Sequence, residues 1–223
     1  MKPTRSEIFG NRKEFKSAAL IGLVFLAFSF AYSLIAFIHY EPAVHVHEYA
    51  PSKIALEILG HFTFGLVPSL LLFDLNLSLL CASTAVLIDS DHILAAADFN
   101  VSGRPDHSFL FAAFSAIVIL LAAERFHLPD KSFVKSAFVG PITLFSHISF
   151  DIFAATNSGA SSFPLMVPFS FSGFYLPPYY WLLFEFIAAG FSICGFLLSR
   201  RFGRTVQKQG EPSSIDQRVK VSK

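Results

Sequence analysis

Charged residues are scarce in this chain of 223 residues: Asp, Glu, Lys and Arg make up 15%, against about a quarter in a globular domain. Opposite charges nearly cancel, and the formal net charge of +1 excludes a strongly basic nucleic-acid-binding surface. The two cysteines, Cys81 and Cys194, both lie in apolar runs, which excludes a disulfide framework and a thiolate zinc knuckle. The sequence also contains no nucleotide-binding loop, no nucleophile motif and no internal repeat.

Hydrophobic residues are abundant instead: they make up 53% of the chain, and Phe alone occurs 28 times. One soluble core of this size cannot bury so many apolar side chains, so most of them face lipid or each other. A bilayer core is crossed by about 20 apolar helical residues. We therefore predict an all-α fold, a polytopic transmembrane helical bundle of about six spans. The predicted spans are Ser17–Ile38, Ile54–Phe73, Leu75–Ile88, Ser108–Ala123, Phe133–Phe153 and Tyr180–Ser199.

The first of these runs, Ser17–Ile38, has an alternative interpretation as a signal peptide, because a basic segment precedes it. The run is longer than a typical signal-peptide core, and no small-x-small cleavage site follows it. We interpret it as an uncleaved first span.

The basic residues predict the orientation of the bundle. Of the 17 Lys and Arg residues, only Lys53 and Arg104 fall in the connections assigned to the outer side. An excess of Lys and Arg marks cytoplasmic segments, so both termini are predicted to be cytoplasmic. Residues 1–16 form a basic N-terminal segment, 17–199 a single transmembrane domain, and 200–223 a polar, basic and disordered tail. This pattern is typical of a multi-pass protein of a prokaryotic cell membrane.

Several His and Asp residues fall toward the predicted outer side of four different spans. Ionisable groups within spans cost roughly 2.5–3.5 kcal/mol each, so they usually face a partner or a cavity. A divalent cation offsets that cost for several ligands together, and imidazole with carboxylate suits zinc best, with manganese or iron as alternatives. The predicted metal ligands are His61, Asp89, Asp91, His107, His147 and Asp151.

The spacing within this set adds to the argument. His147 and Asp151 are four residues apart and therefore share one helical face. Asp89 and Asp91 reach one site only if the third span ends there. Each group alone also fits a simpler role, as a helix–helix hydrogen-bond partner or a solvated acid at a helix end. We expect His39, His45 and His47, which lie outside any span, to be loop residues.

The outer loop from Thr156 to Pro178 carries no charge and is rich in Phe, Pro, Gly and Ser. It is too apolar for free solvent, so it either lies in the membrane interface as a lid over the polar cluster or packs against the helix ends without a role in binding. A lid suits a lipid or another amphipathic substrate.

The chain contains an ordered set of motifs: His61, Leu87-Ile88-Asp89-Ser90-Asp91, Asp106-His107-Ser108, His147-Ile148-Ser149-Phe150-Asp151 and Val167-Pro168-Phe169-Ser170. This set resembles the membrane-bound, metal-dependent hydrolase-like family known as YdjM or DUF457. The resemblance covers roughly residues 55–175. It implies a metal-dependent hydrolase, and it departs from the family at two places: Ile88 replaces a common Pro, and the first His of a His-Arg-Gly motif is missing. His92 or Arg104 takes over the role of that His, or the role is lost.

Our leading hypothesis is therefore a membrane-embedded hydrolase acting on a lipid phosphoester or another amphipathic ester. Asp91 is the candidate general base, Arg104 the candidate clamp for an anionic headgroup, and Ser108 a residue that orients a ligand. The bilayer and a lipid substrate are the expected partners, and nucleic acid is not. Two alternatives stay open: a transporter or metal-handling protein that uses the same groups, and a catalytically silent protein whose polar cluster holds helices together.

Overall fold

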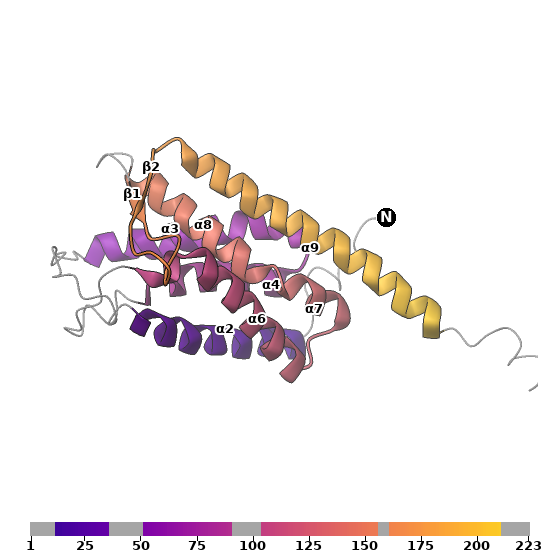
Figure 1. The fold of residues 1–223 in the computed structure, drawn as a ribbon. Helices are drawn as coiled ribbons and strands as arrows, with labels where there is room; N and C mark the ends of the chain where they lie inside the picture. Colours follow the sequence, from indigo (N-terminus) through magenta and orange to yellow (C-terminus); the bar gives the residue numbers. More distant parts are fainter. Residues whose placement is uncertain (1–11, 36–50, 91–103, 156–160, 211–223) are drawn as a thin grey trace, which may run out of the picture.

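A computed structural model shows the fold (Figure 1) and describes residues 12–35, 51–90, 104–155 and 161–210. The described chain is mainly helical, which confirms the all-α prediction. The α-helices are α2 (Arg12–Ser33), α3 (Pro51–Ser69), α4 (Leu75–Leu87), α6 (Phe109–Arg125), α7 (Asp130–Ser136), α8 (Val139–Ala154) and α9 (Tyr180–Gly210). Two short 3₁₀ helices, η2 (Leu70–Leu72) and η3 (Pro105–His107), and an antiparallel pair of strands, β1 (Ser161–Phe163) and β2 (Phe174–Leu176), complete it.

Three segments, Arg12–Ser33, Ile54–Leu72 and Tyr180–Phe202, are long and apolar enough to cross a membrane. A helix lies at each of the six predicted positions, but α4, α6 and α8, with 13, 17 and 16 residues, are each shorter than a full crossing, so six spans stay a prediction. The last helix differs from expectation, because α9 continues to Gly210 and so includes the first residues of the predicted tail.

The segment of the predicted fifth span is long and apolar enough to cross a membrane only as a bent pair of helices. The segment divides into α7 and α8, whose axes differ by 44°. Pro141 explains the break, since proline has no N–H to donate and its ring clashes with the carbonyl four residues earlier, at Ala137. Pro141 is tolerated in the first turn of α8, where an N–H has no helical acceptor.

The turn between α3 and α4 lies where the sequence predicts it. Phe73 adopts a left-handed conformation with φ 49°, and Asp74 caps α4 by accepting a hydrogen bond from the Leu77 amide at 3.3 Å. Ser132 donates to the Asp74 carboxylate at 2.6 Å, and Lys135 lies 3.7 Å from it, which ties this turn to α7. The start of α2 and the end of α9 lie toward the same end of the bundle as this turn (Figure 1).

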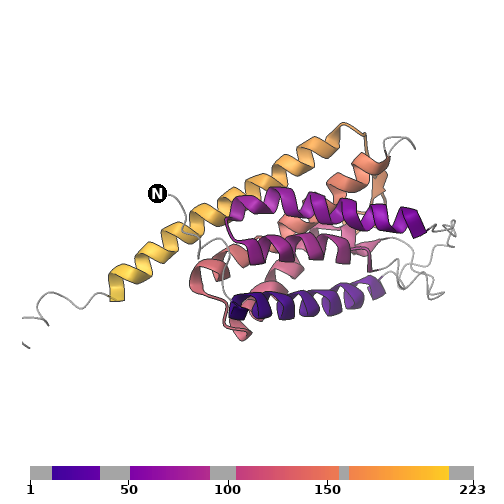
Figure 2. The same ribbon diagram turned by 180° about the vertical axis from the view of Figure 1, so that it is seen from behind.

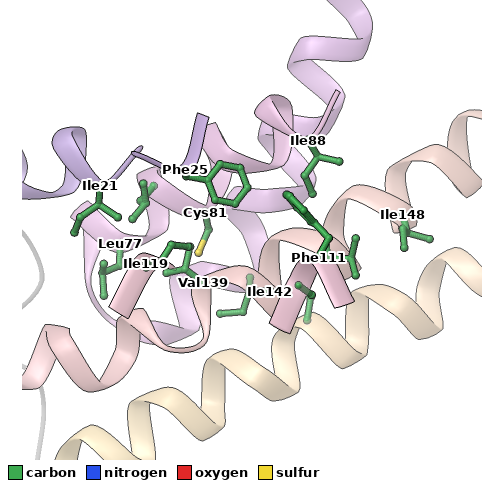
Figure 3. Packing of buried hydrophobic residues seen from close by; sticks show 14 of the residues in the cluster. Ile21, Phe25, Leu77, Cys81, Ile88, Phe111, Ile119, Val139, Ile142 and Ile148 are labelled. Carbon is green, nitrogen blue, oxygen red and sulfur yellow. The ribbon is translucent and has the colours of Figure 1, made fainter. Parts of the chain in front are cut away.

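The buried core lies between α2, α4, α6 and α8 (Figure 3). Apolar side chains on α3 and α9 point outward instead: Leu56, Leu59 and Phe186 are each more than 60% exposed. Figure 2 shows α3 along the outside of the bundle, beside α4. Apolar helix faces of this kind, turned away from the protein interior, are typical of helices in contact with lipid.

Helices α6 and α8 approach each other closely at Gly140. A Cβ atom on Gly140 would overlap Ser115 Oγ and lie 2.7 Å from the carbonyl oxygen of Ala112, which is backbone and cannot move aside. We expect Gly140→Ala to lower the free energy of unfolding in detergent by about 1–3 kcal/mol. The matched control is Gly190→Ala in α9, where a Cβ would meet nothing within 4 Å. Equal thermal stability of the two variants would contradict the close packing of α6 on α8.

Candidate metal centre

Five of the six predicted ligands lie together at the end of the bundle that carries the β-hairpin. His61 comes from the middle of α3, Asp89 follows the end of α4, His107 ends η3, and His147 and Asp151 are one turn apart in α8. The helix α4 ends at Leu87, and Asp89, two residues later, lies beside the three histidines. His107 and His147 are fully buried, whereas the Asp89 and Asp151 side chains are 20% and 14% exposed.

The ligand atoms converge at distances that suit one small cation. His61 Nε2 lies 3.1 Å from Asp89 Oδ2 and 3.4 Å from Asp151 Oδ1. His147 Nε2 lies 3.4 Å from Asp89 Oδ1, and His107 Nε2 lies 3.4 Å from Asp151 Oδ2. Two ligands of one tetrahedral zinc ion are about 3.3 Å apart, since each is about 2.0–2.1 Å from the metal. The residue types and their spacing therefore fit a divalent metal ion.

A hydrogen bond to the backbone orients the His147 ring so that its Nε2 can bind a metal ion. Its Nδ1 donates to the carbonyl oxygen of Ala85 at 2.7 Å, which leaves the lone pair of the neutral ring on Nε2. That Nε2 lies 2.9 Å from His107 Nε2, and the His61 ring stacks on the His147 ring at 4.0 Å. At 2.9 Å, either one ring donates an N–H to the other or both lone pairs bind one cation.

Electrostatics keep two of the ligands in the protonation state that a metal requires. Burial, together with the nearby Arg104 guanidinium, lowers the pKa of His107 to about 3, so its imidazole is neutral at pH 7. Burial alone would raise the pKa of Asp89, but its contacts with His147 and His61 hold the pKa well below its usual range. Neutral imidazole and ionised carboxylate are the metal-binding forms.

Arg104 reaches the same carboxylates from the exposed side of the cluster. Its Nη2 lies 3.0 Å from Asp151 Oδ2 and 3.4 Å from Asp89 Oδ1, and its side chain is 35% exposed. The Arg104 backbone is left-handed, with φ 40°, directly before Pro105, a conformation that costs a residue other than glycine about 1–3 kcal/mol. The surrounding contacts hold Arg104 in this strained position beside the ligands.

A buried network that the sequence argument missed lies behind the cluster. The carboxylate of Asp106, a residue that is fully buried, accepts hydrogen bonds from Ser29 Oγ and Ser33 Oγ of α2, each at 2.8 Å. Ser90 joins the network through Ser29, at 2.9 Å between their hydroxyl oxygens. Asp106 precedes His107 and Ser90 follows Asp89, so α2 is linked to the backbone that carries two of the candidate ligands.

The β-hairpin covers the cluster on another side. Phe163, fully buried, stacks near His107 with 6.0 Å between ring centroids, and the Arg104 guanidinium lies 6.0 Å from the Phe163 ring. The Phe109 amide donates to the carbonyl oxygen of Leu165 at 3.0 Å. This hydrogen bond connects the loop between β1 and β2 to the start of α6. Phe169, by contrast, is 82% exposed. The described part of the apolar loop therefore lies against the polar cluster.

Other predicted residues are not placed in the cluster by the described contacts. Asp91 lies outside the described residues, as do His92 and the three loop histidines, His39, His45 and His47. Ser108 caps α6, since its Oγ accepts from the Phe111 amide at 3.1 Å, and its hydroxyl lies 3.3 Å from that of Tyr32. The proposed roles of Asp91 and Ser108 in ligand orientation and catalysis stay predictions.

Comparison of the chain with family models, with curated proteins and with solved structures found no match.

Proposed function

We propose that this chain is a multi-pass membrane protein, of the prokaryotic cell membrane, that uses a divalent metal ion to hydrolyse an ester. The observation that carries the proposal is the convergence of three imidazole Nε2 atoms and two carboxylates, with His147 oriented by the Ala85 carbonyl. Zinc is the first candidate, with manganese or iron as alternatives. The proposal includes membership of the YdjM or DUF457 hydrolase-like family, on the sequence motifs given above.

The ion would supply Lewis acidity and a lowered pKa for water, the usual basis of metal-dependent ester hydrolysis. The chain's own residues then hold the substrate and move the proton. Arg104, at the exposed edge, is suited to a phosphate or carboxylate oxygen. Asp91 stays the proposed general base, and Ser108 the residue proposed to orient a ligand.

A lipid phosphoester is the substrate class that we propose first. The cluster lies at one end of a bundle with apolar outward faces, below a hairpin with an exposed Phe169. An amphipathic substrate in the bilayer presents its headgroup at such a depth, beside interfacial aromatic residues. The hairpin is the proposed lid over that headgroup.

The test is turnover by detergent-purified protein in mixed micelles containing phosphomonoester or phosphodiester lipids. We expect hydrolysis that requires zinc, manganese or iron, stops with a chelator and returns when metal is restored. His147→Ala should lose both metal and turnover, whereas His127→Asn, beyond the opposite end of α6, should lose neither. His127 has φ 54°, so Asn is the suitable control there. Stoichiometric metal without hydrolysis of any of these esters would refute the proposed hydrolase activity. It would favour a role in metal handling or a structural role.

A further inference from the structure

In each of the two carboxylates of the cluster, one oxygen lies near His61 and the other lies near His107 and His147. Asp89 Oδ2 and Asp151 Oδ1 face His61 Nε2 at 3.1 and 3.4 Å. Asp89 Oδ1 and Asp151 Oδ2 face the other two histidines, at 3.4–3.9 Å. Carboxylates that bridge two groups of ligands in this way are common in centres with two metal ions about 3.5–4 Å apart. The ligand set alone therefore leaves a choice between one ion and two.

The second pair of oxygens already has a cation beside it. Arg104 Nη2 lies 3.4 Å from Asp89 Oδ1 and 3.0 Å from Asp151 Oδ2, the same two oxygens that face His107 and His147. A guanidinium stays protonated in proteins, so this charge is permanent. A second metal ion between these oxygens would lie directly against it.

The charges of these groups favour a single ion. Two carboxylates and one guanidinium, with neutral imidazoles, carry a net charge of −1, which one divalent ion changes to +1 and a second ion to +3. The ligands are mostly buried, where repulsion between like charges is stronger than in water. A net charge of +1 also attracts an anionic group.

The backbone shows that Arg104 is held in this place. Its left-handed conformation before Pro105 is unfavourable for any residue with a side chain, and glycine would adopt it freely. A residue in such a conformation persists where the surrounding structure holds it, and these positions concentrate at functional sites. The ion pairs with both carboxylates and the Phe163 ring at 6.0 Å are among the contacts that hold it.

We propose that the centre binds one divalent ion, and that the Arg104 guanidinium takes the place of a second ion and binds an anionic oxygen of the ligand. The inference rests on the metal centre proposed above and specifies its stoichiometry and its ligand class, phosphate or carboxylate. In a centre with two metal ions the second ion binds such an oxygen, whereas here a fixed side chain does so.

The test measures zinc stoichiometry and affinity in the detergent-purified full chain, by elemental analysis and titration calorimetry. We expect one zinc ion per chain in the wild type. Arg104→Met removes the charge and retains the length of the side chain, so it should bind a second zinc ion, or bind the first with a Kd lower by at least about tenfold. Arg104→Lys keeps the charge and should bind one ion. Inorganic phosphate should bind the zinc-loaded wild type and lose at least about tenfold in affinity in Arg104→Met.

The outcomes separate this inference from the proposed function. Two zinc ions in the wild type would overturn the inference and leave the metal-dependent function intact, whereas no bound metal would overturn the function itself. One ion in Arg104→Met with an unchanged Kd would also overturn the inference. Arg104→Gln provides the same comparison where Arg104→Met does not fold, and the wild-type stoichiometry decides independently of any variant.

Discussion

Asp151→Ala is expected to abolish metal binding and with it every metal-dependent activity. The carboxylate lies 3.0 Å from Arg104 and within 3.4–3.6 Å of the Nε2 atoms of all three histidines, so its loss removes a ligand and leaves the Arg104 charge with one carboxylate fewer. Even outer partners of metal ligands contribute about 10–100-fold to affinity, so a direct ligand should contribute at least about 100-fold. Zinc content by elemental analysis after dialysis measures the effect.

The matched control is Asp74→Ala, which removes another buried carboxylate at the opposite end of the bundle. Asp74 caps α4 and pairs with Lys135, so this variant should lose stability, by about 0.5–2 kcal/mol for the cap alone, and keep its metal. Asp151→Asn, nearly the same shape as aspartate, separates loss of the ligand charge from loss of packing. Full zinc content in both Asp151 variants would show that this carboxylate is no ligand.

The site residues that could be predicted from the sequence are those that violate a strong rule, that apolar helices seldom contain ionisable groups. An ionisable group in an apolar helix is expensive, so His61, His147 and Asp151 stand out in the sequence itself. Their shared side of the bundle follows from the distribution of Lys and Arg, and the described structure brings them together as predicted. The helices were predictable for the same reason, since long apolar runs have few alternatives in a bilayer.

The residues that the sequence argument missed break no such rule. A serine in a helix commonly donates to the carbonyl three or four residues earlier, as Ser146 does to Ile142 and Ser192 to Ala188, so it gives no signal. Ser29 and Ser33 instead donate across to Asp106, and nothing local distinguishes them from the others. Their spacing of four residues on one face of α2, opposite a buried acid, was the one available indication.

The break between α7 and α8 is a different case. Pro141 indicated it, but hydropathy averages over such a residue and favours one continuous span. The bend has a consequence for the centre, because α8 alone carries His147 and Asp151 and its direction determines where they point.

The network around Asp106 leads to the second large prediction. Asp106 accepts two hydrogen bonds of 2.8 Å from α2. His107 follows Asp106 and Asp89 precedes Ser90, and both are proposed metal ligands. Asp106 touches neither the ion nor the substrate in this scheme; it is a positioning residue. Asp106→Ala removes the acceptor of these two hydroxyl groups, so the attachment of the segments that carry His107 and Asp89 to α2 is weakened. The contact between Ser29 and Ser90 stays.

We expect Asp106→Ala to raise the Kd for zinc by about 10–100-fold, the range found for partners behind metal ligands. Breaking a buried network should also lower the free energy of unfolding by about 1–3 kcal/mol. Ser33→Ala should show a smaller change in both. The control is Ser192→Ala in α9, a buried serine that donates within its own helix and should leave the zinc Kd unchanged.

Stability and zinc affinity must be measured separately, because a network that only joins helices would change the stability and leave the zinc affinity unchanged. Thermal unfolding of the metal-free variants gives the stability, and zinc titration below their unfolding temperatures gives the affinity. If Asp106→Ala unfolds earlier but binds zinc as tightly as the wild type, the network joins helices without positioning ligands. If the zinc Kd rises in Ser33→Ala, rises further in Asp106→Ala and stays unchanged in Ser192→Ala, then α2 helps to form the metal centre. It does so although none of its residues touches a ligand atom in the described contacts.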